Sequence, residues 1–215
     1  MTDIEDNKIY FEDSFLSTET IEEVTTQDAY TNWNLAEIQM STGVASTGSD
    51  FIYYSSKAFN PTYGELTFKL RMSSAADCFA FFGFKENLTA PTEVMAESHI
   101  GIMISGGKLY LSSASEDIHH AGQERLEIVG LDMTKVYEFK IAGNKVYYKP
   151  LPQVEVYLGM PTIKTAVREW HLLGELSNYT PDNQVHYICL YIKNTTGTEK
   201  LIYLNRIIYK EAYAD

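Results

Sequence analysis

The sequence predicts an all-β fold, built as a two-sheet antiparallel sandwich. Three observations support this prediction. The 215 residues include 16 Tyr and 10 Phe, and aromatic side chains fit the half-buried surface of a strand. Short runs alternate between apolar and polar residues, with turn signals at intervals of roughly 8–12 residues. Only one stretch, Thr162–Leu173, offers a convincing helical spacing of apolar residues.

The clearest element is a hairpin over Val136–Lys149, with the sequence VYEFKIAGNKVYYK. A two-residue loop at Gly143-Asn144 suits a tight hairpin turn, because glycine reaches positive φ without a steric penalty. The cross-strand pairs that this loop predicts are Ile141 with Val146, Phe139 with Tyr148, Lys140 with Tyr147, and Glu138 with Lys149. One face of the hairpin is then apolar and the other charged, as expected for a sheet with one solvated side.

The other elements follow in chain order. The predicted strands are Lys8–Phe15, Phe51–Ser55, Gly64–Ser73, Cys78–Phe84, the two strands of a hairpin over His99–Leu111, Glu124–Val129, Val154–Leu158, Val185–Lys193 and Lys200–Lys210. Cys78–Phe84 is apolar on both faces, which predicts a central strand covered on both sides. Thr162–Leu173 is predicted as one short helix, since Pro161 precedes it and Gly174 can cap it. A strand is the alternative interpretation of that stretch.

The chain is predicted to be a single domain over residues 1–215, because no repeat, low-complexity tract or linker divides it. Sandwiches of roughly 200–250 residues are commonly one domain. Residues 1–30 hold nine acidic residues against one lysine and so carry −8 of the net charge of −12. This segment is predicted as an acidic N-terminal arm, solvated or docked on a basic neighbour. An acidic chain without a basic stripe argues against nucleic acid as a partner.

The two cysteines, Cys78 and Cys189, each lie in an apolar strand-like run. Two buried free thiols are the favoured interpretation, and a disulfide between neighbouring strands is the alternative. The first residues are acidic and lack the apolar core of a signal peptide. No apolar run approaches the ~20 residues of a membrane span. We therefore expect synthesis in the cytoplasm without a signal peptide, with a virus particle as one route to the outside.

Several segments resemble the concanavalin A-like lectin/glucanase (laminin-G-like) sandwiches. FEDSF near the start is similar to their acidic-aromatic opening, and HIGIMISGGKLYL and VYEFKIAGNKVYYK are similar to their two mid-chain hairpins. LIYLNRIIYKE resembles their terminal strand, which returns beside the first strand. The resemblance implies a jelly roll of two curved sheets, and relatives often hold sugars on the concave face.

The glucanases of this class place acids on one strand face in the pattern E-x-D-x-E, because a period of two directs alternate carboxylates to the same side. The sequence lacks this pattern. Its nearest match, Glu65–Lys69, has Thr and Lys where acids belong, and Glu155 stands alone because Gln153 replaces a second acid. The adjacent pair His119-His120 is interpreted as a solvated loop, since adjacent side chains of an extended segment point apart. No metal and no cofactor are predicted.

Four side chains are candidates for ligand binding: Tyr147, Tyr110, Lys149 and Glu138. Hairpin pairing places Tyr147 on a polar face with Glu138 and Lys149, where the core does not account for an aromatic ring. Trp33 and Trp170 are predicted to lie in the core or to anchor the helix to a sheet.

Because the sequence lacks a catalytic motif, we predict a protein without catalytic activity. We predict a structural or adhesive module of a larger assembly, most simply a virion or phage-tail decoration or receptor-binding protein. Its partners would be other proteins, with homo-oligomerisation expected. The first alternative is a soluble carbohydrate-binding lectin module, and the second is a glycoside hydrolase of the concanavalin A-like class. The chain is not predicted to be an enzyme, and these functional expectations rest on fold analogy.

Overall fold

The computed structural model describes residues 8–13, 24–30, 35–41, 50–115, 122–150, 154–157, 160–163, 169–179, 185–196 and 200–211. Every regular element within these ranges is a strand, and these strands pair antiparallel. The strands form an eight-stranded sheet, a six-stranded sheet and a separate two-stranded hairpin. The predicted all-β, two-sheet antiparallel sandwich is confirmed.

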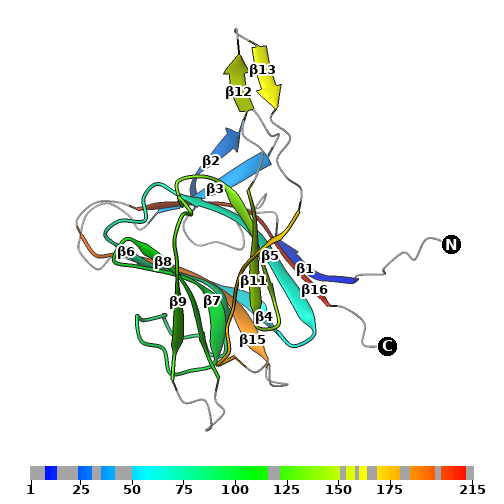
Figure 1. Ribbon diagram of the computed structural model, residues 1–215, viewed down its shortest axis with the longest axis vertical. Coiled ribbons are helices and arrows are strands. Elements are labelled where there is room, and N and C mark those ends of the chain that lie inside the picture. The colour runs from blue at the N-terminus through cyan, green and yellow to red at the C-terminus, as the bar shows by residue number, and fades with distance from the viewer. Residues whose placement is uncertain are drawn as a thin grey trace, which may run out of the picture.

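The eight-stranded sheet has the order β14-β11-β10-β5-β16-β3-β2, with β1 also pairing with β16. Its strands are β1 (Lys8–Asp13), β2 (Val24–Tyr30), β3 (Leu35–Ser41), β5 (Gly64–Met72), β10 (Tyr137–Ala142), β11 (Lys145–Pro150), β14 (His171–Glu175) and β16 (Leu201–Glu211). In Figure 1, β1 and β16 lie side by side, as the resemblance to a returning terminal strand implied.

The six-stranded sheet has the order β4-β15-β6-β7-β8-β9. Its strands are β4 (Asp50–Phe59), β6 (Cys78–Lys85), β7 (His99–Ser105), β8 (Lys108–Ala114), β9 (Glu124–Ile128) and β15 (His186–Asn194). The third unit, β12 (Val154–Tyr157) with β13 (Met160–Ile163), stands away from both sheets at the top of Figure 1.

The main core lies between the two sheets. Strand β5 supplies Leu66, Phe68, Leu70 and Met72, each at most 1% exposed, while its alternate residues are half-buried or exposed. Opposite them, β6 is buried along its whole length. The prediction of a central strand covered on both sides is therefore confirmed. Burial of an apolar side chain contributes about 1.5–3 kcal/mol, so these alternating rows fix which face of each strand turns inward.

Both predicted hairpins are confirmed in register. Ile141 pairs with Val146 and Glu138 with Lys149 around Gly143, whose φ is +58°. In the other hairpin, Ile102 pairs with Leu111. Positive φ at the turn is the conformation that a two-residue hairpin loop requires.

The predicted helix over Thr162–Leu173 is wrong at both ends. Its first two residues belong to β13, which pairs with β12, and its last three belong to β14, which pairs with β11. Residues 164–168 lie outside the described part of the chain. Ladder hydrogen bonds to strands elsewhere outweigh the weak local preference that a helical spacing expresses.

Two described strands fall inside the predicted acidic arm. Strand β1 pairs with β16, and β2 pairs with β3, so these parts of residues 1–30 belong to the eight-stranded sheet. The division into an arm and one sandwich domain stays a prediction.

Gly64 opens β5 beside a buried tyrosine. A Cβ atom at this position would lie 2.3 Å from ring atoms of Tyr209, which is itself 2% exposed and whose hydroxyl donates to the Asn60 carbonyl at 2.7 Å. The backbone at Gly64 therefore needs a residue without a side chain.

We expect Gly64→Ala to lower the free energy of unfolding by about 1–3 kcal/mol, because the Tyr209 ring must move within a packed core. Urea unfolding followed by tryptophan fluorescence measures this change. The exposed Thr195→Ala variant serves as control and should stay within about 0.5 kcal/mol of the parent. Equal midpoints for Gly64→Ala and the parent would contradict the packing described.

Candidate functional site

A pocket of about 330 Å³ lies at one end of the sandwich. It is formed by the turn after β5, the turn between β7 and β8, and the crossover segment 127–134 that leads from β9 to β10. Its lining residues are Ser74, Ala75, Gly107, Lys108, Leu109, Glu127, Ile128, Val129, Gly130, Leu131, Asp132, Met133 and Thr134. The crossover matters because it carries the chain from one sheet to the other and so lies over the end of the core.

The crossover is held in place by backbone hydrogen bonds. The Met72 amide donates to the Met133 carbonyl at 2.8 Å, which ties the segment to the end of β5. Asp132 accepts from the Thr134 hydroxyl at 2.6 Å and from the Thr134 amide at 3.0 Å. Asp and Thr favour such local turns because their short side chains reach nearby backbone groups. The pocket wall is thus a defined turn.

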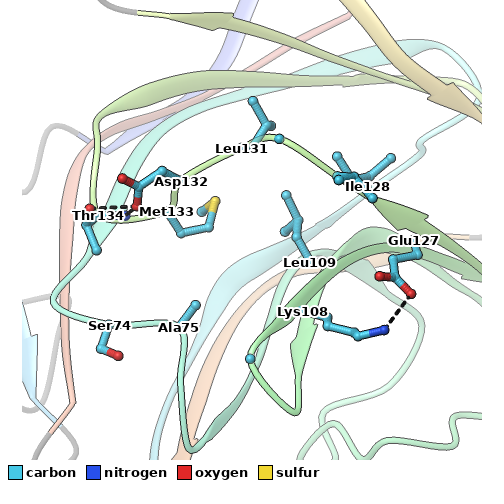
Figure 2. Close-up of a pocket in the computed structure, with 13 residues that line it drawn as sticks. Ser74, Ala75, Lys108, Leu109, Glu127, Ile128, Leu131, Asp132, Met133 and Thr134 are labelled. Atoms are coloured by element: carbon cyan, nitrogen blue, oxygen red, sulfur yellow. Dashed lines mark hydrogen bonds and ion pairs between the residues drawn. The ribbon is translucent and has the colours of Figure 1, made fainter.

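The floor of the pocket is aliphatic and its rim is charged. Leu109 and Met133 are 5% and 3% exposed and belong to the main core. Figure 2 shows Asp132 with Thr134 on one side of these residues, and Glu127 with Lys108 on the other. Two acidic residues of the crossover therefore line one cavity, with the Asp132 carboxylate turned toward Thr134 and the Glu127 carboxylate toward Lys108.

Electrostatics distinguish the two sides of the rim. The hydroxyl and then the amide of Thr134 hold the pKa of Asp132 below its usual range, so this carboxylate is ionised at neutral pH. Across the pocket, the Lys108 ammonium lies 3.0 Å from a carboxylate oxygen of Glu127, and both side chains are about half exposed. The Glu127 side chain raises the pKa of Lys108. This pair is accessible to a ligand.

A second polar site lies on the outer face of the eight-stranded sheet. We call it the tryptophan platform: Tyr147, Trp170, Lys140, Lys149, Glu138 and Glu65. The Lys149 ammonium lies 2.7 Å from a Glu138 oxygen and 4.6 Å from the centre of the Trp170 ring. The Lys140 ammonium lies 3.3 Å from a Glu65 oxygen, 4.9 Å from the Tyr147 ring centre and 5.1 Å from the Trp170 ring centre.

Three of the four predicted ligand-binding residues come together here. Tyr147, Lys149 and Glu138 all belong to the tryptophan platform, as the hairpin pairing implied. Tyr110 lies on β8 of the other sheet, where the Arg125 guanidinium stacks 4.4 Å from the centre of its ring. Ligand binding by these residues stays a prediction. The prediction that Trp170 lies in the core or anchors a helix is wrong, because its half-buried ring lies beside two ammonium groups on the outer face of the sheet.

The outer face of the six-stranded sheet is covered. A second cluster of buried side chains lies there: Phe79, Phe81, Met95, Met103, Cys189 and Tyr191, with Tyr54 and Tyr110 packed against it. Met95 comes from the loop 86–98 and is 1% exposed. Both cysteines are free thiols. Burial raises the pKa of Cys78 to about 11 and that of Cys189 to about 12, so neither is a reactive thiolate at neutral pH.

The loop 86–98 is fixed by a buried lysine. The Lys85 ammonium is fully buried and lies 2.8 Å from a Glu97 oxygen and 2.8 Å from the Thr89 hydroxyl. Burial alone would raise the pKa of Glu97, but the hydrogen bond and charge of Lys85 outweigh it and hold that pKa low. The charge is thus paired, as a buried charge must be.

Beside this lysine lies a buried histidine in a hydrogen-bonded chain. Gln123 donates to the Ser112 hydroxyl oxygen at 2.8 Å, so the Ser112 proton is directed to His99 Nε2 at 2.9 Å. His99 Nδ1 in turn donates to the Glu97 carbonyl at 2.8 Å. A serine beside a histidine suits nucleophilic catalysis only where substrate can reach it. Ser112 is fully buried, so this chain of bonds is structural.

The described part of the chain lacks two features of known sites. None of its strands carries the E-x-D-x-E pattern, and it holds no group of three or more His, Cys, Asp or Glu side chains that could bind a metal. No helix within it is long and apolar enough to cross a membrane.

Sequence reasoning missed the pocket. Lys108, Glu127 and Asp132 are separated along the chain and are brought together only by the crossover and the hairpin turn. The one local signal is Asp132 followed by Thr134 after Gly130, which is typical of a turn. A turn signal carries no information about what the turn faces.

The chain shares its fold with carbohydrate-active proteins. It is similar to an endo-acting O-glycanase described with mucin breakdown by the human gut microbiota, at a TM-score of 0.57, with 12% identity and coverage of 96% of this chain and 100% of that one. A pseudo β-1,3-glucanase of Mycobacterium tuberculosis also matches at a TM-score of 0.57, with 7% identity and coverage of 95% of this chain and 99% of that one. LamA from Zobellia galactanivorans, in complex with laminaritriose and laminaritetraose, matches at a TM-score of 0.56. The identity is 14%, and the match covers 95% of this chain and 99% of that one.

Other similar structures include a β-glucanase of Bacillus licheniformis and a legume lectin-like domain of Entamoeba histolytica. No protein-family model matches the chain, and no curated protein matches it. These comparisons establish the fold alone: the chain has a jelly-roll sandwich like those of the concanavalin A-like lectins and glucanases. The predicted resemblance is confirmed at that level.

The comparisons correct the main functional prediction. The structures that share the fold are mostly glucanases, laminarinases and a transglycosylase, which contradicts a non-catalytic structural or adhesive module of a virion or phage tail. The prediction that the chain is not an enzyme is contradicted by the same finding. The prediction rested on the absence of the E-x-D-x-E strand alone. Acidic residues can also line a cavity from a loop, as Glu127 and Asp132 do.

The buried His99 predicts a pH-dependent stability. Burial lowers its pKa to about 4, whereas an unfolded histidine titrates near 6.5. The unfolded state therefore binds the proton first as the pH falls. Stability from this group is complete above about pH 6.5 and is lost toward pH 4, by about 3 kcal/mol in total. Urea unfolding at pH 7, 5.5 and 4.5 measures the loss.

His99→Gln should flatten this dependence by about that amount, because glutamine does not titrate. His171→Gln replaces an exposed histidine on β14 and should retain the parent's dependence. If His99→Gln and the parent lose the same free energy between pH 7 and 4.5, the assigned role of His99 is wrong.

Proposed function

We propose that this chain is a carbohydrate-active protein that binds a polysaccharide and hydrolyses its glycosidic bonds at the pocket of Figure 2. The observation that carries the proposal is that one cavity, in a fold shared with glucanases, is lined by the two acidic residues Glu127 and Asp132. Hydrolysis of glycosides typically uses two such groups on either side of the bond to be cut.

The rest of the pocket suits a sugar ring. Its aliphatic floor, Leu109 and Met133, offers a surface for the C–H face of a pyranose. The rim offers hydrogen-bond partners for hydroxyl groups, in Lys108, Ser74 and Thr134. Sites for small ligands commonly combine an apolar lining with a few converging polar groups.

The two carboxylates have different environments, and this divides their roles. Asp132 is held ionised by Thr134, so it is the group to stabilise or attack the anomeric carbon. Glu127 is then the proton donor to the leaving oxygen. A sugar that enters between Lys108 and Glu127 takes the place of the ammonium group beside the Glu127 side chain.

A panel of glycans tests the proposal. The panel contains laminarin, a mixed-linkage β-glucan and mucin O-glycans, chosen from the names of the structural neighbours. Hydrolysis is followed by the release of reducing ends. Glu127→Gln and Asp132→Asn should each lower kcat/KM by about 100-fold or more, since each removes one carboxylate from the reaction.

Glu175→Gln is the matched control, because Glu175 is also a half-exposed carboxylate that pairs with a lysine, Lys145 at 3.7 Å. It should hydrolyse at the parent rate. Undiminished hydrolysis by the Glu127 and Asp132 variants would place the reaction elsewhere. Binding of a glycan without turnover by the parent would rule out hydrolysis and leave the lectin function.

Protein partners, homo-oligomerisation and synthesis in the cytoplasm stay proposals that follow from the sequence. Light scattering of the purified chain tests the oligomeric state.

A further inference from the structure

We propose that the tryptophan platform is a second glycan-binding site, which holds a neutral polysaccharide on the outer face of the eight-stranded sheet. This inference rests on the proposed function, because it names a further surface for the same polymer. It concerns residues that the pocket does not use: Tyr147 and Trp170 with two lysine–glutamate pairs.

The platform combines the groups that a sugar chain requires. Tyr147 and Trp170 are half-buried, and the parts of their rings that Lys140 and Lys149 leave uncovered can pack against the apolar faces of pyranose units. The carboxylates of Glu138 and Glu65 accept hydrogen bonds from hydroxyl groups, and the ammonium groups of Lys140 and Lys149 donate them. Tyrosine and tryptophan supply large contact areas at a low entropic cost, because they have two side-chain torsions each.

These groups are already ordered. Lys149 is held between Glu138 and the Trp170 ring, and Lys140 between Glu65 and the rings of Tyr147 and Trp170. The side chains of Lys149, Glu138 and Lys140 are 23%, 16% and 17% exposed. A ligand that binds here does not have to fix long, mobile side chains, and this reduces the cost of binding.

The charges of the platform select a neutral ligand. Two ammonium groups are matched by two carboxylates at 2.7 and 3.3 Å, so the site presents dipolar hydrogen-bonding groups without an excess of either sign. An anionic polymer would face two carboxylates here on a chain of net charge −12. Neutral hydroxyl groups can bridge between each ammonium and its carboxylate.

The strand arrangement suits a polymer. Tyr147 of β11 lies directly across from Lys140 of β10, which lies across from Thr67 of β5. Neighbouring strands are about 4.8 Å apart, a step comparable to the length of one sugar unit. A polysaccharide that runs across the strands therefore meets a new protein side chain at each sugar unit.

The platform and the pocket are connected through the chain. The crossover 127–134 that lines the pocket leads into β10, whose outward residues Glu138 and Lys140 begin the platform. A polymer bound at both sites gains affinity through the second, effectively intramolecular contact. A short oligosaccharide that fills the pocket alone gains nothing from the platform.

The test compares laminarin, a neutral polymer, with laminaritetraose. Affinity is measured by calorimetry and hydrolysis by reducing-end release. Trp170→Ala and Tyr147→Ala should each weaken binding of laminarin by about tenfold, with hydrolysis of laminaritetraose within about twofold of the parent. Trp170→Phe keeps an aromatic ring and should retain most of the laminarin affinity. Circular dichroism and thermal unfolding check that each variant is folded.

Tyr203→Ala is the matched control, because Tyr203 also stacks with a cation, Arg71 at 3.6 Å, but lies outside the platform. It should bind laminarin like the parent. Only variants that are folded are compared, so that a loss of laminarin binding reports the loss of the side chain. The inference is overturned if Trp170→Ala and Tyr147→Ala bind laminarin as the parent does, or if the parent prefers a sulfated polymer to laminarin. If the parent neither binds nor cleaves any glycan of the panel, the proposed function fails and the platform inference fails with it.

Discussion

The pairing of β5 with two partners is the constraint on which the rest of the structure depends. This strand lies between β10 and β16, and its inward side chains are at most 1% exposed. A shift of one residue in either pairing would turn Leu66 and Phe68 outward and Glu65 and Thr67 into the core. The hydrophobic effect therefore fixes the register, and the register places every outward residue of the neighbouring strands.

Both candidate sites follow from that register. On the outer face, it aligns Glu138 with Lys69 and Lys149, and Lys140 with Thr67 and Tyr147, which builds the tryptophan platform. At the end of β5, the bond from Met72 to Met133 draws the crossover over the end of the core. The pocket exists because the chain must pass from one sheet to the other at that point. Glu127 and Asp132 line opposite sides of the pocket because both belong to this passage.

The fold was largely predictable from the sequence because its signals are local. Alternation in β5 and the turn glycines of two hairpins specify strands and register within a few residues. The stretch Thr162–Leu173 misled because its apolar spacing fits a helix, while its strand partners lie elsewhere in the chain. The pocket was not predictable for a related reason: Lys108, Glu127 and Asp132 line one cavity only through the packing of three loops, and no local pattern marks them. Tyr147, Lys149 and Glu138 were identified because one hairpin places them together.

The proposed function requires a glycan in the pocket that Glu127 and Asp132 line. Methyl NMR tests this most directly, because Met133, Leu109 and Leu131 line the cavity and carry methyl groups. On titration with laminaritetraose, the methyl signals of these three residues should shift together and saturate at one dissociation constant, with smaller changes at the core residue Leu190, which does not line the pocket. Saturable shifts confined to other residues, with the signals of Met133, Leu109 and Leu131 unchanged, would contradict the account.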